Sequence, residues 1–238
     1  MQSQNKDAGL ISNIEQLKDR ILVNHAELVW KLLKDCNLKK TTQRTDFVLD
    51  NAGFEMFTDL CLAEFILHSN LTKNVYLHLK KIPWFVSDSL RKDLLWMLDK
   101  MKNSASEAVS YLGNKWASRL DGGSFVLREH EFWSLPHDYS LLKTQSSELY
   151  EDLSKANLVF FKGDLNYRKL VGDRKWPHSV AFEKALWGFC PTAVCALRTL
   201  KADVQVGLLP GQDTELDKLE KDWMVNGSYG VIQFAGKA

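Results

Sequence analysis

The chain has 238 residues, with 31 basic and 30 acidic side chains, and 45% of its residues are hydrophobic. This length can bury one sizeable core, and the near balance of charge argues against binding to nucleic acid or to anionic membranes. No stretch approaches the ~18 uninterrupted apolar residues of a membrane span. The four cysteines form no Cys-x-x-Cys pair and no zinc-like spacing with histidine. We therefore expect a soluble protein of a reducing compartment, cytoplasmic and with nuclear presence left open.

The N-terminal part of the chain predicts a tail and then a helix. Residues 1–10 are polar and predict a disordered tail, so that one α/β domain would occupy residues 11–238. Ser12 and Glu15 form a capping box ahead of apolar residues at helical spacing from Leu17 to Leu32. This pattern predicts one long amphipathic helix.

Strand and helix patterns alternate along the rest of the chain. This alternation predicts βαβ units, and hence a mostly parallel sheet with helices on both faces, a Rossmann-like α/β/α sandwich. The runs at 157–161 and 193–197 are almost wholly apolar, which is typical of strands buried on both faces. The predicted strands cover 46–50, 74–80, 124–128, 157–162, 192–198 and 229–234, and the predicted helices cover 53–68, 88–118, 144–155 and 213–223.

Polar residues follow four of the predicted strands. Asp50 and Asn51 come directly after the first strand, Asp88 follows the second, and Asp164 and Lys201 follow two later ones. The carboxyl ends of strands line the ligand crevice of an open α/β sheet. Carboxylate and amide oxygens suit divalent ions such as Mg²⁺ or Mn²⁺, and a lysine suits a phosphate group. The pattern therefore favours a metal–phosphate site.

Each of these residues also has a structural interpretation. Asp50 and Asn51 are residue types that favour turns and helix N-caps, and Asp88 could cap the helix that follows it. Glu55 would lie in a first helical turn, where the helix dipole favours a carboxylate in any case. A single lysine after a strand, such as Lys201, is common. Spacing alone leaves these alternatives open.

The segment from Gly163 to Lys169 is the richest in polar side chains. It offers a glycine for close backbone approach, a helix start whose free amides can hold phosphate, and the planar guanidinium of Arg168. An ordinary capped turn with surface cations is the alternative. The aromatic segment 132–139 could line a substrate pocket, although core packing is the commoner role for Trp133 and a structural role is open to His137.

Some motifs are absent from the sequence. It contains no Gly-x-x-x-x-Gly-Lys-Ser/Thr loop and no Gly-x-Gly-x-x-Gly turn after a strand. It also lacks the Asp-x-Asp nucleophile motif, since Asn51-Ala52 stands in that place. These absences argue against a P-loop ATPase, an NAD-binding enzyme and a haloacid-dehalogenase-like phosphatase.

Four ordered motifs resemble the damage-control phosphatases, in the eukaryotic branch (subfamily III) that is also called acidic residue methyltransferase. The motifs are Asp50-Asn-Ala-Gly-Phe-Glu55, Ile82-Pro-Trp-Phe-Val-Ser-Asp88, Phe161-Lys-Gly-Asp-Leu-Asn-Tyr-Arg-Lys169 and Arg198-Thr-Leu-Lys201. The resemblance runs from about residue 15 to the C-terminus. Members of this branch carry a helical region ahead of the core, which we expect to be missing from this chain.

The resemblance implies a metal-dependent phosphatase that acts on small sugar phosphates such as fructose 1-phosphate and fructose 6-phosphate. Mn²⁺ would be its metal, with Co²⁺ or Ni²⁺ as substitutes. Asp50, Asn51 and Asp88 would bind the metal, and Asp50 and Asp88 would be catalytic. The substrate contacts would comprise the same three residues together with Glu55, Asp164, Leu165, Asn166, Tyr167, Arg168 and Lys201.

Two other functions remain as alternatives at this point. The branch's second name implies a carboxyl methyltransferase that uses S-adenosylmethionine, but the acidic crevice and the absence of a glycine-rich cofactor loop argue against it. The other is a non-catalytic module that holds a metal or a sugar phosphate without turnover.

Overall fold

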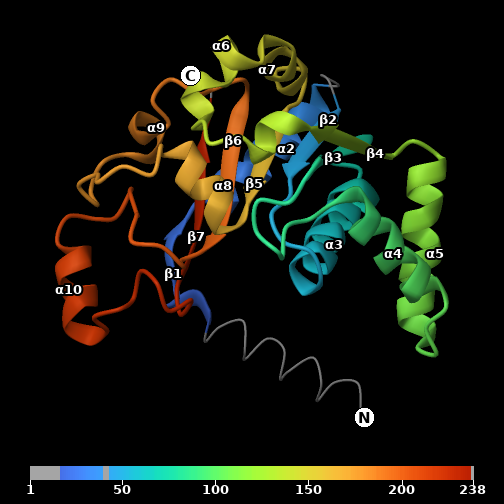
Figure 1. The fold of residues 1–238 in the computed structure, drawn as a ribbon, viewed down its shortest axis with the longest axis horizontal. Helices are drawn as coiled ribbons and strands as arrows, with labels where there is room; N and C mark the ends of the chain where they lie inside the picture. The colour runs from blue at the N-terminus through green and yellow to red at the C-terminus, as the bar shows by residue number, and fades with distance from the viewer. Residues whose placement is uncertain (1–16, 40–42, 237–238) are drawn as a thin grey trace.

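A computed structural model describes residues 17–39 and 43–236 of the chain. In this part of the chain a seven-stranded sheet has the order β1-β7-β6-β5-β2-β3-β4 (Figure 1). Strands β2 to β6 are parallel to one another, whereas β7 runs antiparallel to β6 and β1 runs parallel to β7. The mostly parallel sheet is as predicted. The strands are β1 (Ile21–Asn24), β2 (Arg44–Val48), β3 (Asn74–Lys80), β4 (Phe125–His130), β5 (Leu158–Lys162), β6 (Ala193–Thr199) and β7 (Gly230–Ala235).

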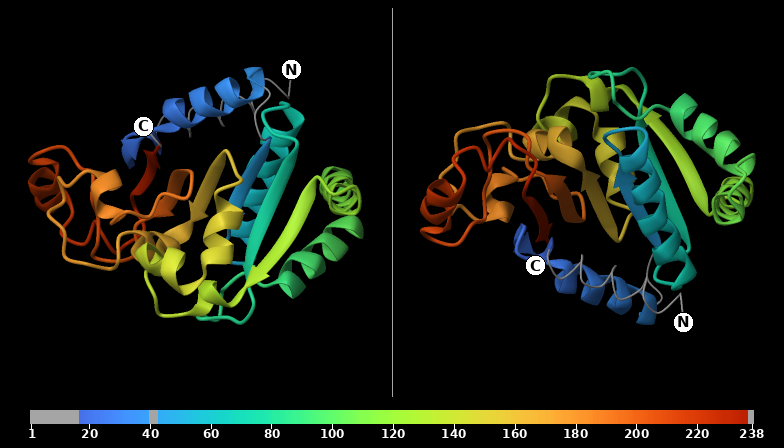
Figure 2. Two further views of the ribbon diagram at one scale, coloured as in Figure 1. Left: turned by 90° about the horizontal axis from the view of Figure 1, so that it is seen from above. Right: turned by 90° about the horizontal axis from the view of Figure 1, so that it is seen from below.

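Helices cover both faces of the sheet, which confirms the predicted α/β sandwich. Figure 2 shows α2 (blue) and the yellow helices α6 to α8 on opposite sides of the strands. One face packs on α2 (Ala26–Leu38), α3 (Phe54–His68), α4 (Arg91–Lys102) and α5 (Glu107–Asp121). The other packs on α6 (Leu142–Gln145), α7 (Ser147–Leu153), α8 (Gly163–Leu170), α9 (Phe182–Ala185) and α10 (Gln212–Leu219), with short 3-10 turns at η1 (Glu131–Ser134) and η2 (Tyr139–Leu141).

The carboxyl-terminal parts of β2 and β5 carry apolar side chains on both sides because each side faces a separate core cluster. In β5, Phe160 packs in the cluster beneath α3, and Phe161 packs in the cluster beneath α8. In β2, Phe47 packs in the cluster beneath α3 and Val48 packs in the cluster beneath α8. Successive side chains of a strand point to opposite faces, so a strand covered on both faces reads as a continuous apolar run.

The prediction of one helix up to Leu32 is wrong over residues 21–24. Ser12, Glu15 and the tail 1–10 lie outside the described residues. Ile21–Asn24 forms β1, which pairs with the start of β7 at the edge of the sheet, and α2 begins only at Ala26. The apolar run Ile21-Leu22-Val23 suits a strand as well as a helix, and pairing with β7 satisfies its backbone hydrogen bonds.

One predicted helix is interrupted, since the helix expected over 144–155 is divided into α6 and α7. The helices expected over 88–118 are α4 and α5, which form a hairpin. In the hairpin, a side chain at Gly113 would lie 2.8 Å from the Cβ of Met101, so glycine lets α5 approach α4 closely. Within residues 17–39 and 43–236, the helices are all too short or too polar to cross a bilayer.

Candidate active site

The parallel strands bring their carboxyl ends, and the polar residues that follow them, to one edge of the sheet. Asp50 follows β2, Lys80 is the last residue of β3, and Asp164 follows β5 at the start of α8. Asp88 reaches the same place because its segment pairs with the residue after Asp50, through an isolated bridge between Asn51 and Asp88. The polar residues predicted at separate strand ends are therefore neighbours.

The ammonium group of Lys80 lies between two carboxylates. Its Nζ is 3.1 Å from Asp50 Oδ1 and 2.9 Å from Asp88 Oδ1, and the three side chains are almost completely buried. The second oxygen of Asp88 accepts hydrogen bonds from the amides of Trp84, at 2.6 Å, and Phe85, at 2.9 Å. Asp88 is thus held by its own loop on one side and by Lys80 on the other.

The other oxygen of Asp50 has weaker support. Asp50 Oδ2 packs against the backbone of Gly163, and its hydrogen bond from Asn51 Nδ2 is long, at 3.4 Å. Burial raises the pKa of Asp50, and the Glu55 carboxylate adds to this increase, while Lys80 opposes both. Lys80 therefore compensates only part of what disfavours the negative charge of the Asp50 carboxylate.

Asn51 and Glu55 extend this group toward solvent. Asn51 donates through Nδ2 to Glu55 Oε2 at 2.9 Å and accepts through Oδ1 from the Ser87 hydroxyl at 2.7 Å. Glu55 Oε1 is buried and has no hydrogen-bond partner among the described residues. An unpaired carboxylate oxygen in such a position is costly, because it has lost its water without gaining a donor.

These residues fit an oxygen-coordinated divalent ion. Asp50 Oδ2 and Asn51 Oδ1 retain acceptor capacity, and Asp88 contributes a second carboxylate beside them. Among the residues that the structure describes, there is no group of three or more His, Cys, Asp or Glu side chains arranged to hold a metal ion. A metal here would depend on the asparagine amide as well as on the two aspartates, which is the donor set of a hard or borderline cation.

A second group of residues is organised around Asp164. Arg198, which is buried, donates through Nε to Asp164 Oδ1 at 2.7 Å, and the backbone amide of Lys201 donates to the same oxygen at 3.1 Å. The remaining Arg198 donors bind the carbonyls of Ala202 and Val204. Arg198 therefore fixes the loop that carries Lys201, whose exposed side chain forms no ion pair within the described residues.

A pocket of about 440 Å³ lies beside these residues, between α3 and the adjoining ends of β5, β6, β7 and β1. Lys162 lines it and forms an ion pair with Asp59 at 2.8 Å. Burial raises the pKa of Asp59 to about 6, although Lys162 opposes the increase. The lining comprises Ile21, Asn51, Phe54, Glu55, Thr58, Lys162, Gly163, Asp164, Leu197, Arg198, Thr199, Lys201, Gly230, Val231 and Ile232.

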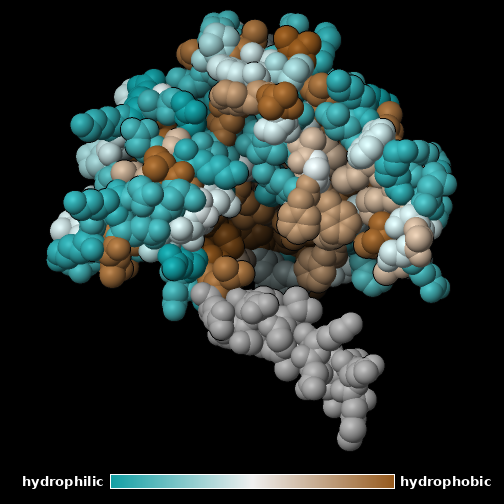
Figure 3. All heavy atoms as spheres, turned by 60° about the horizontal axis from the view of Figure 1, so that its bottom comes forward, coloured by the Kyte–Doolittle hydropathy of each residue, from teal (hydrophilic) through white to brown (hydrophobic). Residues whose placement is uncertain are grey.

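An apolar groove between α2 and α3 adjoins this pocket, since Leu197 and Ile232 line both. Figure 3 shows the hollowed and largely hydrophobic surface on this side of the molecule. The polar pocket therefore has charged residues at the strand ends and an apolar wall toward β1 and β7, a combination that is common in pockets for small organic ligands.

The family model for the damage-control phosphatase ARMT1-like domain matches residues 2–216 of the chain. The chain belongs to this family. It is 46% identical over 230 residues to the damage-control phosphatase ARMT1 of Bos taurus, which covers 95% of the chain and 52% of that protein. It is 44% identical over 238 residues to the Homo sapiens protein of the same name, with 99% and 54% covered. The chain thus spans about half the length of the curated relatives that it matches.

Three of the predicted substrate contacts in this ARMT1-like chain are buried beneath the site. Leu165, Asn166 and Tyr167 lie in α8, and each is less than a tenth exposed. Asn166 donates to the carbonyls of Val48 and Leu49, at 3.2 and 3.3 Å, and accepts from the hydroxyl of Tyr139. Asn166 thereby holds the end of β2, from which Asp50 projects.

Arg168 faces a different hollow. It forms an ion pair with Asp173 at 2.6 Å, and it lines a cavity of about 270 Å³ together with Trp84 and Lys169. Lys201 is not part of that lining. The substrate contacts predicted from the family therefore lie in different places. The 440 Å³ pocket is lined by Asn51, Glu55, Asp164 and Lys201, whereas Asp50 and Asp88 are buried and line neither hollow. Their roles stay predictions.

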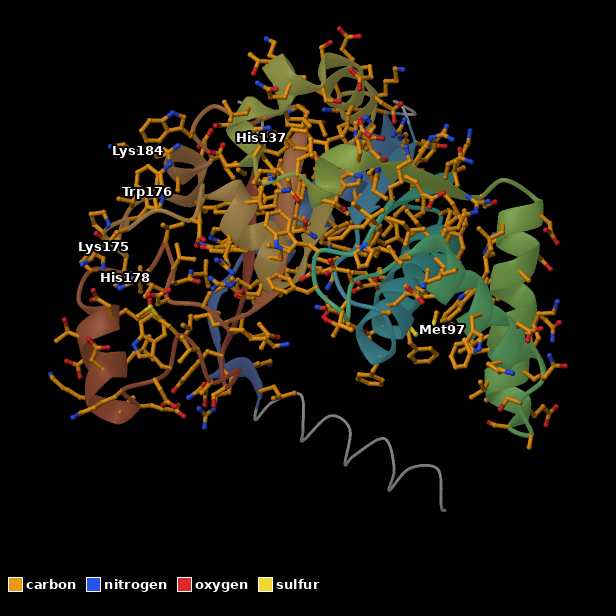
Figure 4. The ribbon with its side chains drawn as sticks, in the orientation of Figure 1. Met97, His137, Lys175, Trp176, His178 and Lys184 are labelled. Atoms are coloured by element: carbon orange, nitrogen blue, oxygen red, sulfur yellow. The ribbon has the colours of Figure 1, made fainter. Side chains whose placement is uncertain are left out.

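The aromatic segment 132–139 packs in the core. Phe132, Trp133 and Tyr139 are each at most 1% exposed, so the structural interpretation holds for Trp133. Figure 4 shows His137 in the upper part of the molecule and Lys175 at its left edge, among side chains remote from α3. Neither residue lines the pocket that contains Lys201.

Two lysines of this family member, Lys80 and Lys162, lie at the site although the sequence patterns did not predict them as site residues. Both are the last residue of a strand, and both form ion pairs with buried aspartates. A lysine that closes an otherwise apolar strand is a usable signal, because a buried ammonium requires an anionic partner. Combined with aspartates at neighbouring strand ends, this signal could have indicated both residues.

Proposed function

We propose that this chain is a metal-dependent phosphatase that hydrolyses sugar phosphate monoesters such as fructose 1-phosphate and fructose 6-phosphate. The proposal rests mainly on the Asp50–Asp88 pair, which lies with Asn51 at the carboxyl edge of the sheet and beside a pocket with lysine side chains. Membership of the damage-control phosphatase family supports the same reaction class. The pocket volume of about 440 Å³ is in the usual range for small-molecule ligands.

Asp50, Asn51 and Asp88 would hold the divalent ion, with Mn²⁺ as the expected metal and Co²⁺ or Ni²⁺ as substitutes. A bound divalent ion supplies Lewis-acid polarisation of a phosphate oxygen. Phosphoryl transfer depends mainly on positioning and charge neutralisation, so the fixed geometry of Asp88 and the buried Lys80 are the protein's main contributions to this part of the site.

The substrate would be oriented by residues on the pocket side. Lys201 lines the pocket and forms no ion pair within the described residues, so its ammonium would bind the phosphate. The amides at the start of α8 would donate to a phosphate oxygen. Glu55 Oε1, which is buried and has no partner among the described residues, would accept a hydrogen bond from a sugar hydroxyl. The apolar wall would cover the carbon skeleton of the sugar.

The decisive experiment is phosphate release from fructose 1-phosphate by the purified chain, with and without Mn²⁺, beside the Asp50→Asn variant. Release should require the metal, and the variant should lose at least about 10²-fold in kcat, as is typical when a charge-stabilising group is removed. Asparagine keeps the shape of the side chain and one acceptor for Lys80, so the fold should persist by circular dichroism.

Asp99→Asn is the matched control, because Asp99 is an exposed aspartate on α4. It should leave the reaction unchanged. Full activity of Asp50→Asn would remove Asp50 from the chemistry. A folded chain that binds Mn²⁺ but releases no phosphate would favour the non-catalytic binding module instead.

Lys201→Met should weaken the binding of the substrate phosphate. We expect KM to rise by about tenfold, equivalent to ~1.4 kcal/mol, because one uncompensated positive charge is removed from the pocket. Lys175→Met, at an exposed lysine far from the pocket, should leave KM unchanged (Figure 4). Identical kinetics for Lys201→Met and the unmodified chain would exclude a phosphate contact at this position.

A further inference from the structure

Lys80 fills the space between the two aspartates of the site. Its Nζ donates to Asp50 Oδ1, Asp88 Oδ1 and the backbone carbonyl of Asp50, at 3.1, 2.9 and 3.3 Å. These three acceptors match the three donors of an ammonium group. Lys80 is only 2% exposed, and like Asp50 and Asp88 it lines neither the 440 Å³ pocket nor the 270 Å³ cavity.

The ammonium lies between two carboxylates, the kind of position that a cation occupies. Two-metal hydrolases hold two ions about 3.5–4 Å apart, which together stabilise the attacking and leaving oxygens. Here the facing oxygens of Asp50 and Asp88 both bind Lys80. A cation inserted between the same two oxygens would meet an ammonium that has no acceptor to offer and that repels it.

The balance of charge at the site also favours the binding of one divalent ion and not two. Asp50, Asp88 and Glu55 supply three carboxylates, and Lys80 neutralises one of them. Two negative charges are left, which one divalent ion balances.

We propose that Lys80 takes the place of a second metal ion between Asp50 and Asp88, and thereby restricts the site to a single divalent ion. Lys80 is then a positioning residue, which orients the two carboxylates before a metal arrives. This inference rests on the proposed metal-dependent function. It goes beyond that function because it explains why the site would bind one divalent ion instead of two.

The test is to measure how many Mn²⁺ ions bind to the full chain, by isothermal titration calorimetry and by the loss of the free-ion signal in electron paramagnetic resonance. The unmodified chain should bind one ion. Lys80→Met, whose side chain ends one atom short of the Nζ position and carries no charge, should bind two ions and should gain more thermal stability from Mn²⁺ than the unmodified chain does. Lys81→Met, at the adjacent exposed lysine, should bind one ion as before.

Each outcome separates the inference from the function on which it rests. No bound ion in the folded, unmodified chain would refute the metal site itself. Two bound ions in the unmodified chain would overturn the role of Lys80 while the metal-dependent function stands. The role is also overturned if Lys80→Met folds and still binds one ion.

Lys80→Gln provides a second variant in case the methionine variant is recovered unfolded, since its amide can still donate to one carboxylate. It must show the same increase to two ions. If neither variant folds even at saturating Mn²⁺, then metal ions do not replace the ammonium, and the inference fails.

Discussion

Replacing Gly163 with alanine should both destabilise the protein and abolish the proposed phosphatase activity. Gly163 has a φ of +80°, and an added Cβ would lie 2.6 Å from the Cβ and Cγ of Asp50 and would overlap its Oδ2. Asp50 cannot turn aside easily, because its other oxygen is held by Lys80. We expect a loss of roughly 2–6 kcal/mol in the free energy of unfolding, from backbone strain and overpacking together.

The same substitution should act on catalysis in the molecules that remain folded. Gly163 lets the start of α8 lie directly against Asp50, so the alanine variant must move either the helix or the carboxylate. A displacement of about 1 Å at a reacting group can reduce the rate by about 10²-fold. Urea unfolding, Mn²⁺ binding and phosphate release measured on the same preparation would separate the two effects.

Gly188→Ala is the control for backbone strain. Gly188 has a φ of +84°, almost the same as that of Gly163, but a Cβ there would meet no atom within 4 Å. This variant should show only the cost of the positive φ, about 1–2 kcal/mol, and should keep its activity. If the two variants unfold at the same urea concentration and Gly163→Ala binds Mn²⁺ normally, the close packing of Gly163 on Asp50 is not important.

Arg44→Met should destabilise the fold strongly without changing the candidate site. Arg44 binds the buried Asp46 through Nε at 2.7 Å and Nη2 at 2.6 Å, and it also binds Asp152 at 2.9 Å. It lies at the amino end of β2, whereas Asp50 follows the carboxyl end. Without Arg44, the buried Asp46 carboxylate would keep only His78 Nε2, at 2.8 Å, as a side-chain partner among the described residues. Removing one partner of a buried ion pair typically costs about 3–5 kcal/mol.

The matched control is Lys155→Met, which removes the other cation beside Asp152. Lys155 is exposed and its Nζ is 3.7 Å from Asp152, so this variant should lose at most about 1 kcal/mol. At 25 °C the folded Arg44→Met chain should retain its KM and its Mn²⁺ affinity. Equal urea midpoints for the two variants would show that the Arg44–Asp46 pair contributes little to stability.

Local pattern was sufficient to predict the fold class and the edge of the sheet that carries the candidate site. Strands buried on both faces read as near-continuous apolar runs, and the apolar residues of amphipathic helices recur about every 3.6 residues. The alternation of these two patterns along the chain predicted the sandwich correctly. Asp50 and Asp164 could be placed near each other from sequence because parallel strands end at a common edge. This inference needs only the order of elements, without knowledge of any side-chain contact.

Only the tertiary structure decided the features that depend on partners distant in sequence. Ile21–Asn24 is a strand because β7, more than 200 residues later, offers it a backbone to pair with. Lys80 lies between Asp50 and Asp88, and Arg168 pairs with Asp173 and does not line the pocket that contains Lys201, because of how neighbouring strands and loops pack. The sequence by itself determined which chemistry gathers at the strand ends. Packing decided which of those side chains face the pocket, because the direction of a side chain depends on its neighbours in space.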